Sequence, residues 1–156
     1  MSNVLIDFRP AIQEDKATLL EFEQQVIGAE RPFNAAIKEK GAHYYDLDFL
    51  ISDVHTELLV GEYQGEVIAV GYLQIRESKA HLQHRQHGYL GFMYVEEAFR
   101  GQGINQQLIN ALLEWGKSQG VKDFYLEVYS ENTAAIRAYQ KLGFRSLVSE
   151  MKLTLE

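Results

Sequence analysis

Short runs of alternating or clustered apolar residues recur along this chain, and they predict the strands of a sheet. The runs lie at Val4–Arg9, Leu58–Val60, Val67–Tyr72, Tyr89–Val95 and Phe124–Tyr129. The second and third runs flank Gln64-Gly65, a dipeptide typical of a tight hairpin turn. After Gly143, residues 144–155 predict one or two final strands.

Apolar residues at helical spacing predict four helices between and after these strands. They run from Glu14 to Ile27, from Tyr44 to Ile51, from Ile104 to a closing Gly120, and from Asn132 to Phe144. Residues 28–41 lack a clear period, and residues 81–87 form a polar connection. The element order therefore predicts an α/β (α+β) fold, a mixed sheet with helices on both faces.

The length and composition narrow the class of protein. A chain of 156 residues without repeats or linkers predicts one domain over residues 1–156. The net charge of −7, from 15 basic and 22 acidic side chains, argues against nucleic-acid binding. It suits a cationic partner such as an amine, but also ordinary solubility. Without cysteine, a long apolar stretch or a secretory signal, we expect a cytoplasmic protein that does not enter a membrane.

The turn between the run that ends at Val95 and the following helix is rich in glycine. It reads Arg100-Gly101-Gln102-Gly103-Ile104-Asn105. A glycine turn before a helix directs several backbone N–H groups and the positive helix end at one point, where a phosphate binds well. Gln106 breaks the dinucleotide pattern Gly-x-Gly-x-x-Gly, and no Lys-Ser/Thr follows to make a P-loop. The turn alone is also compatible with a purely structural role.

A second pattern follows in the helix that Asn132 begins. The residues Asn132, Ala135, Ile136, Tyr139, Gly143 and Phe144 fall in the order Asn-x-x-Ala-Ile-x-x-Tyr-x-x-x-Gly-Phe. Asn132 suits an N-cap and Gly143 a left-handed exit residue. Together, the two patterns resemble the GCN5-related N-acetyltransferases (GNAT superfamily), and the resemblance extends from about Glu57 to Phe144.

The resemblance implies a mostly antiparallel mixed sheet whose strands around Val95 and Glu127 splay into a V-shaped cleft for acetyl-CoA. Main-chain groups of the strand would pair with the pantetheine arm, the turn would hold the pyrophosphate, and Asn132 would contact the arm. The implied cofactor residues are Met93, Tyr94, Val95, Arg100, Gly101, Gln102, Gly103, Asn105, Gln106 and Asn132. The family usually has Gly or Ala where this chain has Asn105, so that side chain either crowds the site, adds a hydrogen bond or has no ligand role.

The same resemblance implies two catalytic residues, Tyr139 and Glu127. Tyr139 matches the tyrosine that protonates the departing thiolate, although a packing tyrosine has the same spacing. Glu127, in a Leu-Glu-Val context, resembles the general base of ribosomal-protein alanine acetyltransferases, although a strand-face carboxylate can simply be solvated. Because the chain lacks cysteine, we expect direct attack through a tetrahedral intermediate rather than a thiol-linked acetyl-enzyme.

The remaining candidates concern the acceptor. The segment Glu30–Phe33 and the pair Tyr44-Tyr45 fall where the family forms its acceptor wall, or they close the core. His81, His84 and His87 are expected to be ordinary exposed histidines, with no metal site. The expected function is acetyl transfer from acetyl-CoA to a primary amine of a small molecule or a peptide N-terminus. The alternative is a noncatalytic acyl-CoA-binding module, and a homodimer is possible.

Overall fold

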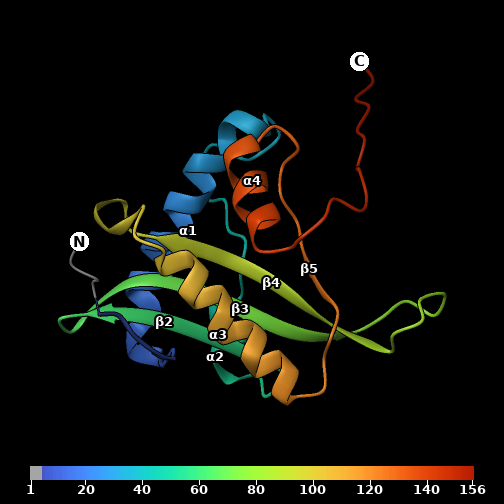
Figure 1. The fold of residues 1–156 in the computed structure, drawn as a ribbon. Coiled ribbons are helices and arrows are strands. Elements are labelled where there is room, and N and C mark those ends of the chain that lie inside the picture. The colour runs from blue at the N-terminus through green and yellow to red at the C-terminus, as the bar shows by residue number, and fades with distance from the viewer. Residues whose placement is uncertain (1–4) are drawn as a thin grey trace. The chain divides into compact units, whose positions relative to one another are not determined.

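The computed structural model describes residues 5–156. The chain forms two compact units, of which the first ends at Leu126 and the second begins at Glu127. The first unit holds a five-stranded sheet in the order β1-β2-β3-β4-β5 (Figure 1). Its strands are β1 (Asp7–Pro10), β2 (Thr56–Tyr63), β3 (Glu66–Glu77), β4 (Gln86–Val95) and β5 (Phe124–Leu126). The first three pairings are antiparallel and the fourth is parallel, so the predicted mixed, mostly antiparallel sheet is confirmed.

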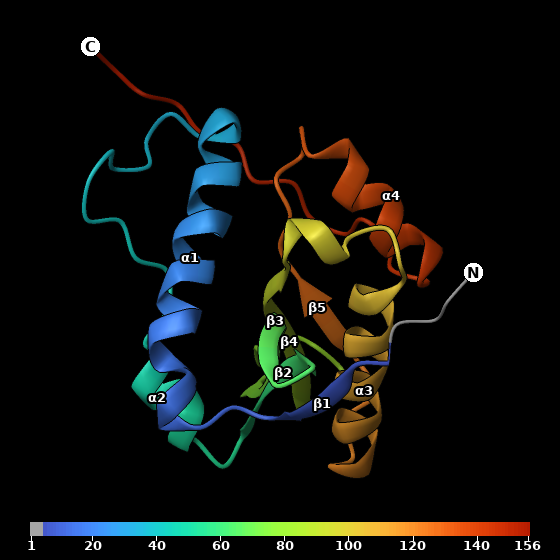
Figure 2. The ribbon, with the colours of Figure 1, turned by 90° about the vertical axis from the view of Figure 1, so that its left-hand side faces the viewer.

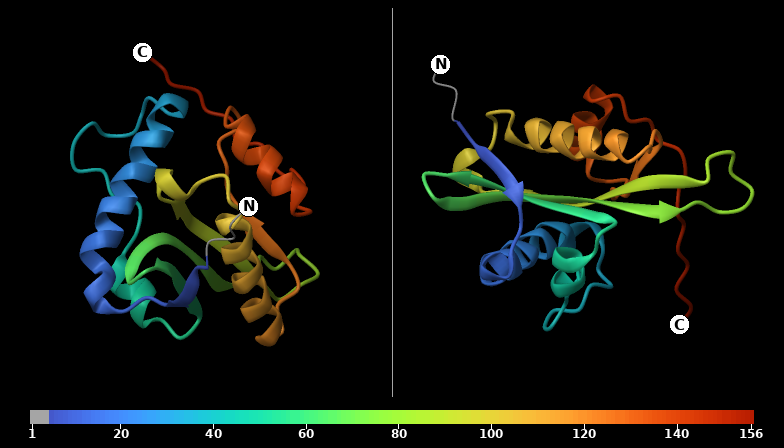
Figure 3. Two further views of the ribbon diagram at one scale, coloured as in Figure 1. Left: turned by 60° about the vertical axis from the view of Figure 1, so that its left-hand side comes forward. Right: turned by 90° about the horizontal axis from the view of Figure 1, so that it is seen from below.

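Helices of the first unit cover both faces of this sheet, as predicted. Helices α1 (Lys16–Glu30) and α2 (Leu47–Ser52) lie on one face, and α3 (Ile104–Ser118) lies on the other (Figure 3). The main core lies between α1, α2 and the sheet, and includes Leu19, Phe22, Leu47, Leu50, Leu58, Val60, Val70, Tyr72 and Phe92. On the other face, Leu108 and Leu112 of α3 and Leu73 of β3 are fully buried.

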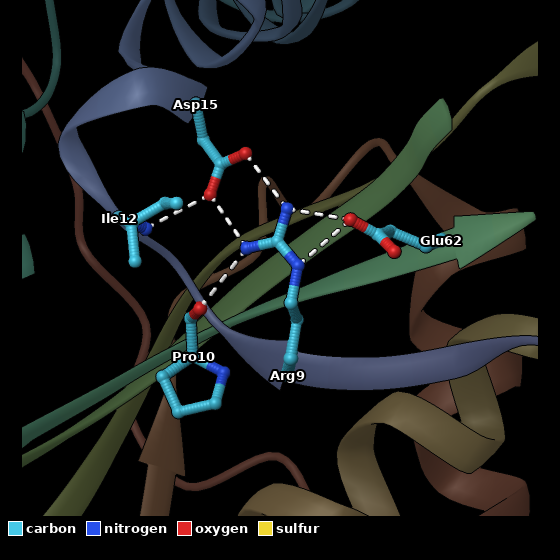
Figure 4. Close-up of polar contacts among 5 residues, drawn as sticks. All are labelled: Arg9, Pro10, Ile12, Asp15 and Glu62. Atoms are coloured by element: carbon cyan, nitrogen blue, oxygen red, sulfur yellow. Dashed lines mark hydrogen bonds and ion pairs between the residues drawn. The ribbon is translucent and has the colours of Figure 1, made fainter. Parts of the chain in front are cut away.

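A three-residue salt-bridge cluster joins β1, β2 and the start of α1 (Figure 4). The Arg9 guanidinium donates to both carboxylate oxygens of Asp15, at 2.8 and 2.9 Å, and through Nε to Glu62 Oε1 at 2.8 Å. The Ile12 N–H also donates to Asp15, at 2.8 Å. These donors, the Arg9 side chain first, lower the pKa of Asp15 below its usual range. Residues 13–15 form a 3-10 turn, so α1 begins at Lys16, two residues after the predicted start at Glu14.

Helix α2 lies beside the start of α1 (Figure 2), and a buried carboxylate of α1 moves the start of α2. Glu23 of α1 is fully buried, and its Oε2 accepts the N–H groups of Tyr44 and Tyr45, both at 2.8 Å. Those residues therefore anchor the loop to α1 instead of beginning a helix at Tyr44. Helix α2 begins after Asp46, whose side chain accepts the Phe49 N–H at 3.1 Å.

The β2–β3 hairpin turns at Gln64-Gly65, as predicted, with φ of 52° and 82°. Both strands run beyond their predicted ends, because the antiparallel pairing with neighbours extends further than the apolar runs. Within the described chain, no helix has both the length and the apolar character needed to cross a membrane.

The second unit contains α4 (Thr133–Lys141), with Asn132 as its N-cap and Gly143 at φ 103°. Two predictions around it are wrong. Strand β5 ends at Leu126 instead of Tyr129, and the described residues 142–156 contain no strand. Both segments carry an alternating pattern, but a strand exists only where a neighbouring strand supplies hydrogen bonds. In the described chain, β5 pairs with β4 from Gly88 to Leu90 only.

Candidate functional site

The end of β4 is bulged and has an open edge. In register, Tyr72 opposes Gly91 and Val70 opposes Tyr94, so Gly71 alone faces the two residues Phe92 and Met93. Phe92 has φ 54°, a conformation that costs a non-glycine residue about 1–3 kcal/mol. Packing holds it there, because its buried ring stacks on Tyr45 at 4.4 Å and 18°. Bulges of this kind redirect backbone groups and are frequent beside active sites.

The bulge requires a glycine next to it. A Cβ at Gly91 would lie 2.4 Å from the Tyr72 Oη, so any larger residue would force the buried Tyr72 ring to shift. Beyond the last β4–β5 pair, at Leu90 and Leu126, the residues Gly91–Val95 form what we call the open edge of β4. The Glu96 N–H donates to Ile68 of β3 at 2.8 Å. Since successive backbone groups alternate in direction, the N–H and C=O of Val95 face the open edge.

Arg100 connects this edge to the glycine turn, residues 100–105. Its Nε donates to the Val95 carbonyl at 2.8 Å, and its guanidinium carbon lies 5.5 Å from the centre of the Tyr94 ring. The Val95 carbonyl is thus occupied by a side chain, while the Val95 N–H remains directed at the edge. Arg100 therefore brings together two segments that sequence analysis proposed separately, the strand and the turn.

The turn leaves the N-terminal end of α3 without a side-chain cap. Gly101 and Gly103 have φ of 79° and 78°, the left-handed region that favours glycine. Gly103 is the N-cap, no side chain of the described residues caps α3, and the first helical N–H bond runs from Gln107 to Gly103 at 3.1 Å. The N–H groups of Ile104, Asn105 and Gln106 therefore precede the hydrogen-bonded helix, at the positive end of its dipole.

Asn105 supplies a further sign of a ligand at this turn. Its Oδ1 is buried and has no hydrogen-bond partner among the described residues. A buried acceptor without a donor costs about 1–3 kcal/mol, so such atoms usually meet a ligand or water. Uncapped amides for a phosphate and an unsatisfied acceptor for an N–H or O–H group together fit a phosphate-bearing ligand.

Three predicted site residues belong to the second unit. Asn132 Oδ1 accepts the Ala135 N–H at 3.3 Å and so caps α4. Tyr139 lies on α4, with its ring 6.0 Å from that of Phe144 at 74°, and its carbonyl accepts the Phe144 N–H at 3.1 Å. Glu127 is exposed and directly follows β5, so it is not the strand residue that the alternation predicted. Their roles stay predictions.

The expected acceptor wall divides into two parts. Tyr44 and Tyr45 line a hollow of about 120 Å³, together with Asp46, Phe49, Leu50, Tyr72, Gln74 and Arg76. Burial raises the pKa of Tyr45, so its hydroxyl stays protonated. Arg31, by contrast, donates to the carbonyls of Lys38 and Glu39, at 2.9 and 3.2 Å, and stabilises its own loop.

The sequence alone does not reveal the histidine cluster, which comprises Ser78, His84, His87 and Tyr125. His81 is exposed, as expected, but His84 and His87 are half-buried and both hydrogen-bond to the Ser78 hydroxyl. The expectation that they are ordinary exposed histidines is therefore wrong. Their three-residue spacing was the available signal, but Ser78 and Tyr125 join them only through the sheet.

Comparison with known proteins decides the family. Residues 20–144 match the acetyltransferase (GNAT) family. The chain belongs to this family. The GNAT chain is 42% identical to the uncharacterized N-acetyltransferase YobR of Bacillus subtilis over 64 residues, which are 41% of this chain but only 26% of YobR. It is 26% identical to the ribosomal protein bS18-alanine N-acetyltransferase of Haemophilus ducreyi, covering 87% of this chain and 80% of that protein.

The GNAT fold also appears in the solved structures. The crystal structure of a predicted acetyltransferase with acetyl-CoA from Clostridium acetobutylicum has a TM-score of 0.76 to this chain. The two share 17% identity over 96% of each chain, a level at which the likeness concerns the fold. The family and fold predicted from the two sequence patterns are thus confirmed.

Proposed function

We propose that this GNAT protein is an acetyl-CoA-dependent N-acetyltransferase that acts on a primary amine. The observation that carries the proposal is the continuity of the open edge of β4, through the Arg100–Val95 hydrogen bond, with the uncapped start of α3. An extended ligand with amide groups at one end and a pyrophosphate at the other suits this continuity. Acetyl-CoA is such a ligand and supplies an activated acetyl thioester.

The first unit offers the donor three kinds of contact. The amides of Ile104, Asn105 and Gln106 would receive the pyrophosphate at the helix end. The N–H of Val95 would donate along the open edge, as an added strand does. The Asn105 Oδ1 would accept a hydrogen from the bound ligand and so lose its unsatisfied state. Met93, Tyr94, Gln102 and Asn132 remain candidate contacts.

For the chemistry we propose direct transfer, in which the neutral amine attacks the thioester carbonyl. Holding the two reactants together can supply roughly 7–11 kcal/mol of the required barrier reduction. Tyr139 would protonate the departing thiolate, since a phenol of pKa about 10 donates readily as that charge develops. Glu127, two residues after Tyr125, is the proposed proton acceptor for the amine.

The acceptor is a small-molecule amine or a peptide N-terminus. The test is acetyl-CoA-dependent thiol release, measured near pH 8 against polyamines, amino acids, amino sugars and N-terminal peptides. A responding amine supports the proposal and names the acceptor class. Saturable CoA binding with no transfer to any acceptor, N-terminal peptides included, would instead assign a noncatalytic acyl-CoA-binding module.

We also propose that the chain forms a homodimer. Support comes from the end of the second unit, where Met151, Leu153 and Leu155 alternate with polar residues and are 94%, 83% and 81% exposed. An alternating apolar face of this kind favours pairing with another strand, and an unpaired edge is a known route to association.

A further inference from the structure

The histidine cluster lies on the sheet face that carries the aromatic hollow. In register, His87 opposes Arg76, while Tyr89 opposes Gln74 on one side and Tyr125 on the other. Directly paired residues point to the same face of a sheet, so His87, Tyr89 and Tyr125 share a face with Gln74 and Arg76. The last two line the hollow. The cluster and the hollow are thus neighbours on one surface of the first unit.

Hydrogen bonds connect the four side chains in series. Tyr125 Oη lies 2.7 Å from His84 Nε2, His84 Nδ1 lies 2.6 Å from Ser78 Oγ, and Ser78 Oγ lies 3.0 Å from His87 Nδ1. Every member is a group that both donates and accepts a proton in its neutral form. The three distances lie in the normal hydrogen-bond range, so the series is continuous from β5 to the start of β4.

The series permits a definite direction of proton flow. In one neutral arrangement, the Tyr125 hydroxyl donates to His84, His84 Nδ1–H donates to Ser78, and the Ser78 hydroxyl donates to the His87 Nδ1. A proton that enters at Tyr125 then displaces one proton at each bond and leaves His87 as an imidazolium. Each intermediate member ends neutral, and half-buried His87 can pass its Nε2 proton to water.

The entrance of the series lies where the open edge of β4 begins. Tyr125 pairs with Tyr89, one position before the final β4–β5 pair. Gly91, the first residue of the open edge, comes two positions after Tyr89. The open edge, along which we place the amide end of acetyl-CoA, therefore begins beside Tyr125, the entrance of the series.

Resting on the proposed acetyl transfer, we propose that Tyr125, His84, Ser78 and His87 form a proton relay that carries the proton of the acceptor ammonium to solvent, in place of a direct transfer to Glu127. The balance is closed within the relay: the ammonium loses one N–H proton to Tyr125 Oη and becomes the nucleophilic amine. The Tyr125, His84 and Ser78 protons each move one bond along, and His87 gains one proton at Nδ1. Rotation of the hydroxyls and exchange with water restore the starting arrangement.

The surroundings of His87 keep its ring neutral between turnovers. Its pKa lies below its usual range, first because of burial and then because His84 and Arg76 add positive charge, while Asp123 acts in the opposite direction. His87 is therefore neutral at pH 7–8 and able to accept a proton. As the pH falls through its pKa, His87 becomes charged before turnover begins, and the relay stops.

The test compares variants by the pH dependence of kcat/KM and by the solvent isotope effect. Ser78→Ala and His84→Gln interrupt the relay, so we expect kcat to fall at least about tenfold with the KM for acetyl-CoA unchanged, within the range of general-acid–base effects. Ser78→Thr keeps the hydroxyl and is expected to retain activity, and His81→Gln is the matched histidine control. In the wild type, a plot of kcat against the deuterium fraction of the solvent should be curved, because several protons move together. In the interrupted variants the plot should become linear.

The outcomes separate this inference from the proposed function. If the wild type transfers acetyl groups and both interrupted variants show its pH profile and its isotope effect, the relay alone is overturned. Absence of transfer to every amine would overturn the proposed function and the relay's role with it. Histidine-ring NMR on the free protein adds a substrate-independent readout: the Nδ1 signals of His84 and His87 should both report a hydrogen bond to Ser78, and Ser78→Ala should change both. Signals that Ser78→Ala leaves unchanged at both histidines would contradict the relay.

Discussion

Gly103 has a positive φ and also lies at the proposed CoA site, whereas Gly41 has a similar φ and lies away from that site. Gly103 and Gly41 have φ of 78° and 72°, and a Cβ at either position would meet open space. They differ in place: Gly103 is the N-cap of α3, whereas Gly41 lies in the loop before α2. Similar backbone strain can therefore be introduced at the proposed donor site and away from it.

Gly103→Ala is expected to weaken CoA binding at least about tenfold, because strain of about 1–2 kcal/mol at the N-cap displaces the amides that receive the pyrophosphate. Gly41→Ala should reduce stability by a similar amount and leave the affinity for CoA unchanged. Calorimetric titration with CoA and urea unfolding of both variants make the comparison. Equal affinity in the two variants would contradict the assignment of the turn.

Asp15 stabilises the fold in a pH-dependent way. Its folded-state pKa is lowered, so its ionised form stabilises the fold above the unfolded pKa near 4, and this contribution is lost as the pH falls through the folded value. Asp15→Asn should therefore reduce the free energy of unfolding by about 1–3 kcal/mol at pH 7, because Arg9 and the Ile12 N–H lose a charged acceptor.

Urea unfolding of Asp15→Asn at pH 7 and at pH 3 measures this difference, which should narrow at the lower pH. Asp48→Asn is the control: Asp48 accepts from Lys16 at 2.9 Å, but both side chains are exposed. We expect little change in stability there, since exposed ion pairs contribute little. A constant difference across the pH range would refute the role given to the Arg9–Asp15 pair.

At the scale of elements, hydrogen-bonded neighbours decide where each strand and helix ends. Strand β3 runs to Glu77 because β4 pairs with it along its length, and β5 stops at Leu126, where its pairing with β4 stops. The bulge at Phe92 and the close approach at Gly91 are properties of the β3–β4 pair, not of either strand alone. Gly91 is therefore required in β4 by the close Tyr72 ring, whereas Gly28 in α1 has no such neighbour.

Gly91→Ala and Gly28→Ala should change stability in opposite directions. At Gly91 the new methyl group meets the Tyr72 ring at 2.4 Å, and overpacking of this kind costs about 1–3 kcal/mol. At Gly28, inside α1, nothing lies within 4 Å, and alanine improves helix propensity by about 0.5–1 kcal/mol. Thermal and urea unfolding measure both, and a stabilised Gly91→Ala variant would contradict the packing described for β4.

At the scale of the whole molecule, the chain comprises the sheet unit that ends at Leu126 and the smaller unit that begins at Glu127. The first has a large core on the α1–α2 face and further packing against α3. The second has α4 and a tail with exposed apolar side chains. In aqueous solution, exposed alternating apolar residues favour association between copies of the chain.

Light scattering after size exclusion is expected to give the mass of a dimer, 2 × 17.9 kDa, at micromolar concentration. Replacing Met151 and Leu153 together by Lys should shift the mass to that of the monomer, because both lie on the alternating apolar face. The control replaces Ser146 and Thr154, at the alternate positions of the same tail, together by Lys, which adds equal charge without changing the apolar face. A monomer in the wild type, or a dimer unaffected by the Met151 and Leu153 changes, would overturn the proposed homodimer.

Sequence by itself determined the family, the four helices, the β2–β3 hairpin and the glycine turn, because these depend on local periodicity, caps and residues with special φ. It also indicated that the glycine turn directs backbone N–H groups and the positive helix end at one point, because both glycines directly precede an amphipathic helix. Only the tertiary structure decided the ends of β5, the loss of the final strands, and the bulge at Phe92. It alone joined Tyr125 to Ser78 and the two histidines, because strand pairing brings together residues more than 40 positions apart. Local patterns specify what an element can be, and the neighbours with which it pairs decide where it ends and what its side chains meet.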